Sequence, residues 1–188
     1  MIFGKKSQCK LVSQHYEKVW GISGRDVGFV GGPTEDFPDG FKVLEFKPHG
    51  ERPMWTYATC GMSAKEDDSQ IELHMFSPKK SGEPVEILVA AAHYHRTGES
   101  LCLGHTVNFG KSWIDDSDCE YGLISLPYLD GPDLENLEIQ DKLVKCYWLL
   151  PVTKLEVEFK KKYGLEALES RFDEKQLDYL DPMRESNV

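Results

Sequence analysis

The sequence predicts an α+β fold in which a mixed or antiparallel sheet carries a buried central helix and helices at both ends, in a single layer on the sheet. Residues 41–76 contain three strand-like segments in succession, residues 85–92 are apolar within a helical pattern, and helical spacing recurs near both ends. With 188 residues, 40% of them hydrophobic and 29% charged, the composition is that of a globular protein. We expect one domain over residues 1–188.

The first part of the chain predicts one helix and then a long loop. Apolar residues recur at helical spacing from Ser7 to Trp20, and Gly21 favours a stop directly after them. Residues 21–40 are rich in Gly, Pro and Asp. This composition predicts turns, with a short extended piece near Phe29 and Val30.

Three strand-like segments then predict an antiparallel meander, at Phe41–Lys47, Met54–Cys60 and Gln70–Phe76. In the third segment, apolar residues alternate with Glu72 and His74, as in a strand with one polar face.

The central helix is predicted between Ser81 and Gly98. Pro84 suits its first turn, and residues 85–92 are apolar on most sides, so this helix should lie buried against the sheet. Further strands are expected at His105–Phe109, Tyr121–Leu126 and Leu143–Leu150, of which the last is apolar enough to be central.

The C-terminal part predicts two helices. Thr153 and Glu156 match a capping box, and Gly164 lies near the end of the helix that they begin. A second short helix is expected directly after it, and residues 184–188 are expected to fray.

Acidic charge is concentrated in one segment of the chain. The sequence holds 22 Lys and Arg against 32 Asp and Glu, a net charge of -10. Residues 112–141, here called the acidic segment, contain no Lys, Arg or His but nine acidic residues, which leaves a net charge of only -1 for the remainder. This charge disfavours direct contact with nucleic acid and with anionic membranes.

The sequence favours a cytoplasmic location. Residues 1–8 lack the apolar stretch of a secretory signal, and no later stretch reaches the length needed to cross a bilayer. Five cysteines, an odd number without a regular spacing, are typical of thiols in a reducing compartment.

Several short motifs occur in a characteristic order. They are the run Trp55–Ser63 (WTYATCGMS), Ile71–His74, the alanines Ala90–Ala92 of the central helix, Leu103–Val107, Leu126–Tyr128 and Asp181–Arg184. In this order and spacing, the chain resembles the suppressor of fused domain family from about Phe41 to Arg184.

The resemblance implies an α+β fold without a cofactor or catalytic residues, and a function in binding another protein. Stand-alone bacterial members look like immunity proteins of polymorphic toxin systems, which bind and neutralise a cognate toxin. The animal founder has an additional lobe and sequesters a transcription factor, so a regulatory scaffold that sequesters an endogenous cytoplasmic protein is the alternative. The resemblance does not identify the residues that touch a partner.

We expect the acidic segment to supply much of a partner-binding surface. A toxin that acts as a nuclease carries a cationic groove for phosphate, and clustered carboxylates would compete for it. An acidic face that only keeps the protein soluble is the other interpretation, and the aromatic residues of the segment suit either anchors or core positions. The predicted partner-binding residues are Asp115, Asp116, Asp118, Glu120, Asp130, Asp133, Glu135, Trp113 and Tyr128.

Neither a metal site nor catalysis is predicted. His93 and His95 are two positions apart on the central helix and should point about 200° apart, which prevents joint ligation. His74 and His105 are expected on the surface of the sheet. Cys60 could act as a nucleophile with His74 or His93 as base, which makes a cysteine hydrolase the third interpretation, although a small buried thiol is expected there. We therefore expect no cofactor, no metal and no enzyme.

Overall fold

The computed structural model describes residues 8–29, 37–38, 40–63 and 69–188 of the chain. In that part of the chain, no helix is both long enough and apolar enough to span a membrane. The elements are α1 (Gln8–Trp20), β1 (Arg25–Val27), β2 (Lys42–Phe46), β3 (Trp55–Cys60), β4 (Ile71–Ser77), α2 (Glu83–Thr97), β5 (Thr106–Asn108), β6 (Tyr121–Ser125), α3 (Pro132–Glu135), β7 (Asn136–Ile139), β8 (Lys142–Val152), α4 (Lys154–Tyr163) and α5 (Leu165–Glu174).

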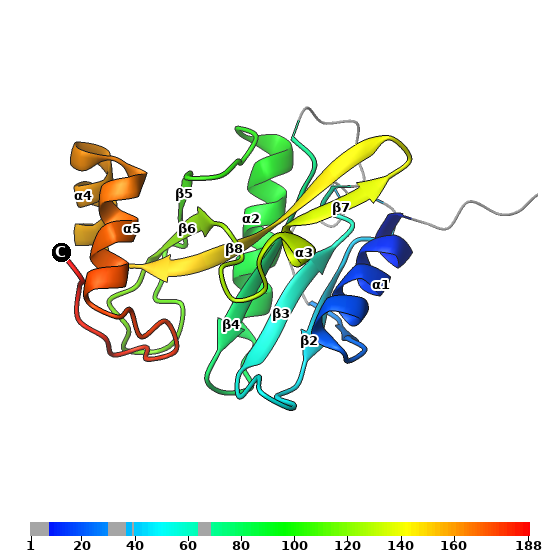
Figure 1. The fold of residues 1–188 in the computed structure, drawn as a ribbon, viewed down its shortest axis with the longest axis horizontal. Coiled ribbons are helices and arrows are strands. Elements are labelled where there is room, and N and C mark those ends of the chain that lie inside the picture. The colour runs from blue at the N-terminus through cyan, green and yellow to red at the C-terminus, as the bar shows by residue number, and fades with distance from the viewer. Residues whose placement is uncertain (1–7, 30–36, 39, 64–68) are drawn as a thin grey trace, which may run out of the picture.

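The strands form one mixed sheet (Figure 1). Its order is β1-β2-β3-β4-β8-β6-β5, and β7 pairs with β8 outside this path. Paired strands are antiparallel except for β4 and β8, which run parallel with Leu73 opposite Tyr147. The predicted α+β class and the antiparallel meander of β2, β3 and β4 are confirmed.

β8 lies inside the sheet, as its apolar sequence predicts, and pairs with three other strands. One of its edges pairs with β4 along residues 145–148. The other edge is shared, because residues 142–145 pair with β7 and residues 148–152 pair with β6. Since β6 and β7 both come from the acidic segment, β8 also determines where the acidic residues lie.

Helices cover both faces of the sheet, so the expectation of a single layer of helices is wrong. On β2, Val43 packs in the core cluster of α2, whereas the next residue, Leu44, packs in the cluster of α1. Successive side chains of a strand point to opposite faces, so α1 and α2 lie on opposite sides. On β8, Val144 packs with α1, and Trp148, on the same face, packs with Leu168 of α5. Figure 1 shows α4 and α5 at the far end of β8 from α1.

Three short elements differ from the prediction. The extended piece lies at β1, slightly before Phe29, and Val30 lies outside the described residues. α3 and β7 were not predicted. In β7, Leu137 and Ile139 are more buried than their neighbours, and this period of two was a usable strand signal in the sequence.

Glu72 of β4 stabilises the turn that follows β3 through hydrogen bonds. Its buried carboxylate accepts backbone N–H groups from Gly61, Met62 and Ser63 and hydroxyl groups from Ser63 and Thr59, at 2.6–3.2 Å. Burial raises the pKa of Glu72, and the hydrogen bonds act in the opposite direction. The polar face of β4 therefore packs inside the protein.

α4 begins with the predicted capping box, and the same Glu156 holds the C-terminal residues. Thr153 and Glu156 exchange backbone-to-side-chain hydrogen bonds at 2.8 and 3.3 Å. Arg184, only 8% exposed, donates to both Glu156 oxygens at 2.7 and 2.8 Å. The N–H of Asn187 donates to the same carboxylate at 3.0 Å. The expectation that residues 184–188 fray is therefore wrong, because a buried ion pair binds them to α4.

Candidate functional site

The acidic segment does not form a single surface in the folded chain. Glu120 directly precedes β6, whose Tyr121 lies opposite Val152 at one end of β8. Glu138 on β7 lies opposite Leu143, at the other end. At about 3.3 Å per residue, these positions are about 30 Å apart along the strand. The segment therefore supplies two separate acidic regions.

The first region is a tight turn, residues 115–120, which we call the acidic turn. Ser117 is buried at its centre, where its Oγ accepts hydrogen bonds from Trp113 Nε1–H at 3.0 Å and from the Cys119 N–H at 3.2 Å. Its carbonyl accepts a hydrogen bond from Ser112 Oγ at 2.6 Å. The exposed carboxylates around it belong to Asp115, Asp116, Asp118 and Glu120. Four negative charges therefore project from a backbone that is fixed by its own hydrogen bonds.

Replacing Ser117 with alanine is expected to loosen this turn and to lower the free energy of unfolding by about 2–3 kcal/mol, because two buried N–H groups lose their acceptor. Urea denaturation measures the change. Ser100→Ala, at an exposed position, is the control and should stay within about 0.5 kcal/mol of the unmodified chain. Equal losses in the two variants would contradict the role given to Ser117.

In the second region, at the other end of the segment, two of the predicted carboxylates are engaged within the protein. Asp130 pairs with Arg52 at 2.6 Å, and its side chain is only 6% exposed. Glu135 pairs with Lys145, also at 2.6 Å. Asp133 on α3 is exposed. Of these three residues, Asp133 is therefore the one whose carboxylate faces solvent.

The two predicted aromatic anchors have opposite environments. Trp113 is 1% exposed and belongs to the core cluster of α2, so its place is in the core. Tyr128 is 59% exposed, and its hydroxyl donates to Glu169 Oε1 at 3.0 Å. Partial burial and the nearby carboxylate raise the pKa of Tyr128 to about 12.

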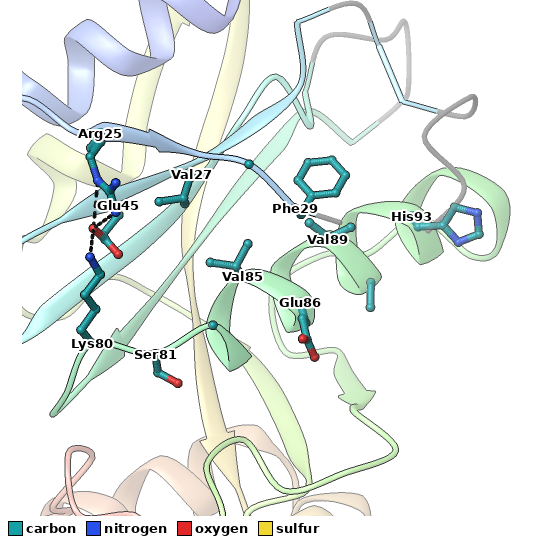
Figure 2. Close-up of a pocket in the computed structure, with 13 residues that line it drawn as sticks. Arg25, Val27, Phe29, Glu45, Lys80, Ser81, Val85, Glu86, Val89 and His93 are labelled. Carbon is teal, nitrogen blue, oxygen red and sulfur yellow. Dashed lines mark hydrogen bonds and ion pairs between the residues drawn. The ribbon is translucent and has the colours of Figure 1, made fainter. Parts of the chain in front are cut away.

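A groove that the sequence did not predict lies between the edge strand β1 and α2. It has a volume of about 710 Å³. Figure 2 shows Val27 and Phe29 facing Val85 and Val89 of α2. Within the described residues, β1 pairs with β2 on one side only. A strand edge beside an apolar floor suits an extended peptide, because main-chain hydrogen bonds and side-chain pockets are then available together.

The rim of this groove carries both signs of charge. Glu45 lies between two cations, with Arg25 at 2.7 Å and Lys80 at 3.5 Å from the same carboxylate oxygen (Figure 2). Glu86 and His93 line the groove along α2. The groove therefore differs in charge from the acidic turn, and it would select a partner by shape more than by net charge.

Cys60 has the environment of a structural thiol. It is fully buried, and its Sγ donates to the Cys9 carbonyl at 2.8 Å. The interaction with Cys9, burial and the Glu72 carboxylate all raise its pKa. Nucleophilic cysteines need an accessible thiolate, so these features weigh against the hydrolase interpretation.

The histidines occupy separate environments. His74 is buried, which corrects its expected place on the sheet surface, and burial together with the Arg52 charge lowers its pKa to about 3. His95 is buried and accepts the Leu101 N–H, whereas His93 lines the groove beside β1. Among the described residues, no three His, Cys, Asp or Glu side chains gather as metal ligands would.

Comparison with known proteins decides the family. A sequence model described as Suppressor of fused protein (SUFU) matches residues 38–185. The chain belongs to the suppressor of fused family. A suppressor of fused homolog from Neisseria gonorrhoeae FA 1090, known from its crystal structure, is 33% identical, with a TM-score of 0.82 over 96% of this chain and 97% of that one.

Three further proteins share less sequence with this chain. Immunity protein YqcF from Bacillus subtilis (strain 168) is 23% identical over 164 residues, which are 78% of this chain and 81% of that protein. The crystal structure of the Sufu-Fu complex matches at 16% identity with a TM-score of 0.70, over 96% of this chain and 92% of that one. Drosophila Suppressor of Fused is also 16% identical, with a TM-score of 0.66. The match covers 98% of this chain and 51% of that one. At this sequence identity, the last two matches show similarity of fold alone.

Proposed function

We propose that this protein is an immunity protein of the suppressor of fused family, which binds a cognate toxin in the cytoplasm and neutralises it by stoichiometric contact. The observation that carries the proposal is the acidic turn, which presents four exposed carboxylates on a hydrogen-bonded frame. The relative named as an immunity protein supports the same function. No catalytic step is required of the chain.

The proposed mechanism is steric and electrostatic occlusion. A basic partner, such as a nuclease domain with a phosphate-binding groove, would be attracted by the acidic turn and by the overall charge of -10. Complementary charge accelerates association and favours the correct partner over others. The turn supplies Asp115, Asp116, Asp118 and Glu120 to the proposed contact surface, and Asp133 and Tyr128 are exposed at other positions.

Reversing the charge of the acidic turn is expected to slow association with the toxin. In the variant Asp115→Lys, Asp116→Lys, Asp118→Lys, the association rate constant at low salt should fall about tenfold or more, and its dependence on salt should flatten. If a toxin gene lies beside this one, its product, co-expressed and purified, serves as the partner, and surface plasmon resonance measures the rates at several salt concentrations.

A matched control separates a local effect from net charge. Lysines at Glu51, Glu99 and Glu138 change the net charge by the same amount at exposed positions outside the acidic turn. This control should retain most of the association rate. An unchanged rate and salt slope in the acidic-turn variant would refute the proposed contact surface, and a toxin that remains active with the unmodified chain would refute the immunity function.

The groove beside β1 favours a second candidate function, a regulatory scaffold that sequesters an endogenous cytoplasmic protein. An extended segment of such a protein could add to the edge of β1 over the apolar floor. The gene neighbourhood discriminates between the two functions, because a toxin gene beside this one favours immunity and its absence favours the scaffold.

A further inference from the structure

A second groove, which shares no lining residue with the groove beside β1, lies between β8 and α5. It is formed by α5, the second half of β8 and the residues that follow β6 and α5, and its volume is about 660 Å³. Aromatic rings line it, from Trp148, Phe172, Tyr179 and the exposed Tyr128. Leu129, 47% exposed, extends this apolar surface at the rim. We call it the aromatic groove.

The charged side chains that line the aromatic groove are all acidic. Glu166, Glu169 and Asp173 recur on one face of α5 at spacings of three and four residues. No Lys, Arg or His is among the described residues that line it. The groove therefore contains both aromatic rings and three carboxylates, and none of the described residues that line it is a cation.

Two arginines near the groove pair with carboxylates that do not line it. Arg52, whose charge reaches Tyr179, pairs with Asp130 at 2.6 Å. Arg171 of α5 pairs with Glu174 and lies over the Phe159 ring. Neither arginine is paired with Glu166, Glu169 or Asp173.

Trp148 is a largely buried residue in the lining of the groove. Trp148 is 5% exposed, and its indole Nε1 is buried without a hydrogen-bond partner among the described residues. Its indole ring lines the groove, so its N–H resonance is a local reporter of a bound ligand.

We propose that the aromatic groove binds an arginine side chain presented by a protein partner. A guanidinium group stacks on aromatic faces and pairs with carboxylates through two parallel hydrogen bonds, and it is more weakly hydrated than the ammonium group of lysine. This inference rests on the proposed function in so far as the partner is the toxin.

The test uses the full chain and N-acetyl-arginine methylamide as the probe. Nitrogen-15-labelled protein is titrated, and the indole N–H resonance of Trp148 reports occupancy of the groove. The groove variant Glu166→Gln, Glu169→Gln, Asp173→Asn should bind the probe about tenfold more weakly, since the loss of several exposed ion pairs amounts to about 1.4 kcal/mol. The lysine analogue should bind the unmodified chain more weakly than the arginine probe does.

The matched control removes three carboxylates from the acidic turn by Asp115→Asn, Asp116→Asn, Asp118→Asn, and it should bind the probe as the unmodified chain does. A Trp148 resonance that does not move, or equal weakening in the two triple variants, overturns the proposal. Tyr128→Ala is a second test that leaves all three carboxylates in place and should also weaken binding.

The toxin then separates this inference from the proposed function. If the probe titration gives the expected result but the unmodified chain does not bind the neighbouring gene product, the immunity function fails and the arginine site stands. If the groove variant binds that product with unchanged affinity while the unmodified chain protects against it, the immunity function stands and the groove is not the contact.

Discussion

Replacing Arg184 with alanine is expected to lower the free energy of unfolding by about 3–5 kcal/mol, because the buried Glu156 carboxylate would lose its charged partner. The arginine donates to both oxygens of Glu156 and also to the Pro151 carbonyl at 3.1 Å. Removing it leaves the charge at the start of α4 uncompensated. Urea denaturation followed by circular dichroism measures the change.

Arg171→Ala is the control for this prediction. Arg171 also pairs with a carboxylate, Glu174 at 2.9 Å, but both side chains are about half exposed, and such pairs contribute about 0.2–1 kcal/mol. A small loss in Arg171→Ala beside a large one in Arg184→Ala is the expected pattern. Comparable losses in the two variants would show that burial of the Glu156 pair does not matter.

Replacing Glu72 with glutamine is expected to destabilise the protein by about 3 kcal/mol. The carboxylate accepts five hydrogen bonds through its two oxygens, whereas an amide of the same shape turns an NH₂ group toward donors at one of those positions. At least two buried donors, such as the N–H of Met62 and the hydroxyl of Thr59, would then lack an acceptor.

The measurement is again the free energy of unfolding in urea, with Glu138→Gln as the control. Glu138 is an exposed strand residue, so the same substitution there should change stability by less than about 0.5 kcal/mol. Hydrogen exchange at the amides of Gly61–Ser63 should also accelerate in Glu72→Gln. If neither the exchange rate of these amides nor the free energy of unfolding changes, Glu72 does not stabilise the turn.

The sequence predicted the elements whose signals are local. Helical spacing in α1, the Thr153 capping box of α4 and the successive strands β2 to β4 each lie within a short window. The order of the sheet was not predictable in this way, because the parallel contact of β4 with β8 joins distant positions. Adjacent apolar residues such as Val43 and Leu44 point to opposite faces of the sheet, so both faces are apolar and helices cover both. A search for one apolar face that alternates with a polar face misses this pattern.

The errors at single residues have a common cause, which is a partner far along the chain. Arg184 was expected in a fraying tail because its partner, Glu156, is 28 positions away in the sequence and gives no local signal. His74 was expected on the surface because it alternates with apolar residues, yet it packs beside Trp20 of α1. Polar residues in a strand indicate solvent only when no other element covers that face.

The candidate site shows the same limit. The acidic segment is continuous in the sequence, and the exposure of Asp115, Asp116 and Asp118 agrees with a solvated acidic loop. Its division along β8, and the pairing of Asp130 with Arg52, depend on the tertiary fold. The two grooves were not visible in the sequence, since each is lined by residues from several elements.

The parallel pairing of β4 with β8 has a consequence for the time course of folding. Hairpins such as β2–β3 join near neighbours, whereas Ile71 meets Lys145 only after a loop of more than seventy residues has closed. Long-range parallel pairing is slow for this reason. β5, β6 and β7 attach to the meander of β1 to β4 through β8, so we expect the two parts of the sheet to join late in folding. The aromatic groove is lined by residues 125–179 alone, so we expect it to form with the C-terminal part of the sheet, whereas the groove between β1 and α2 belongs to the other part.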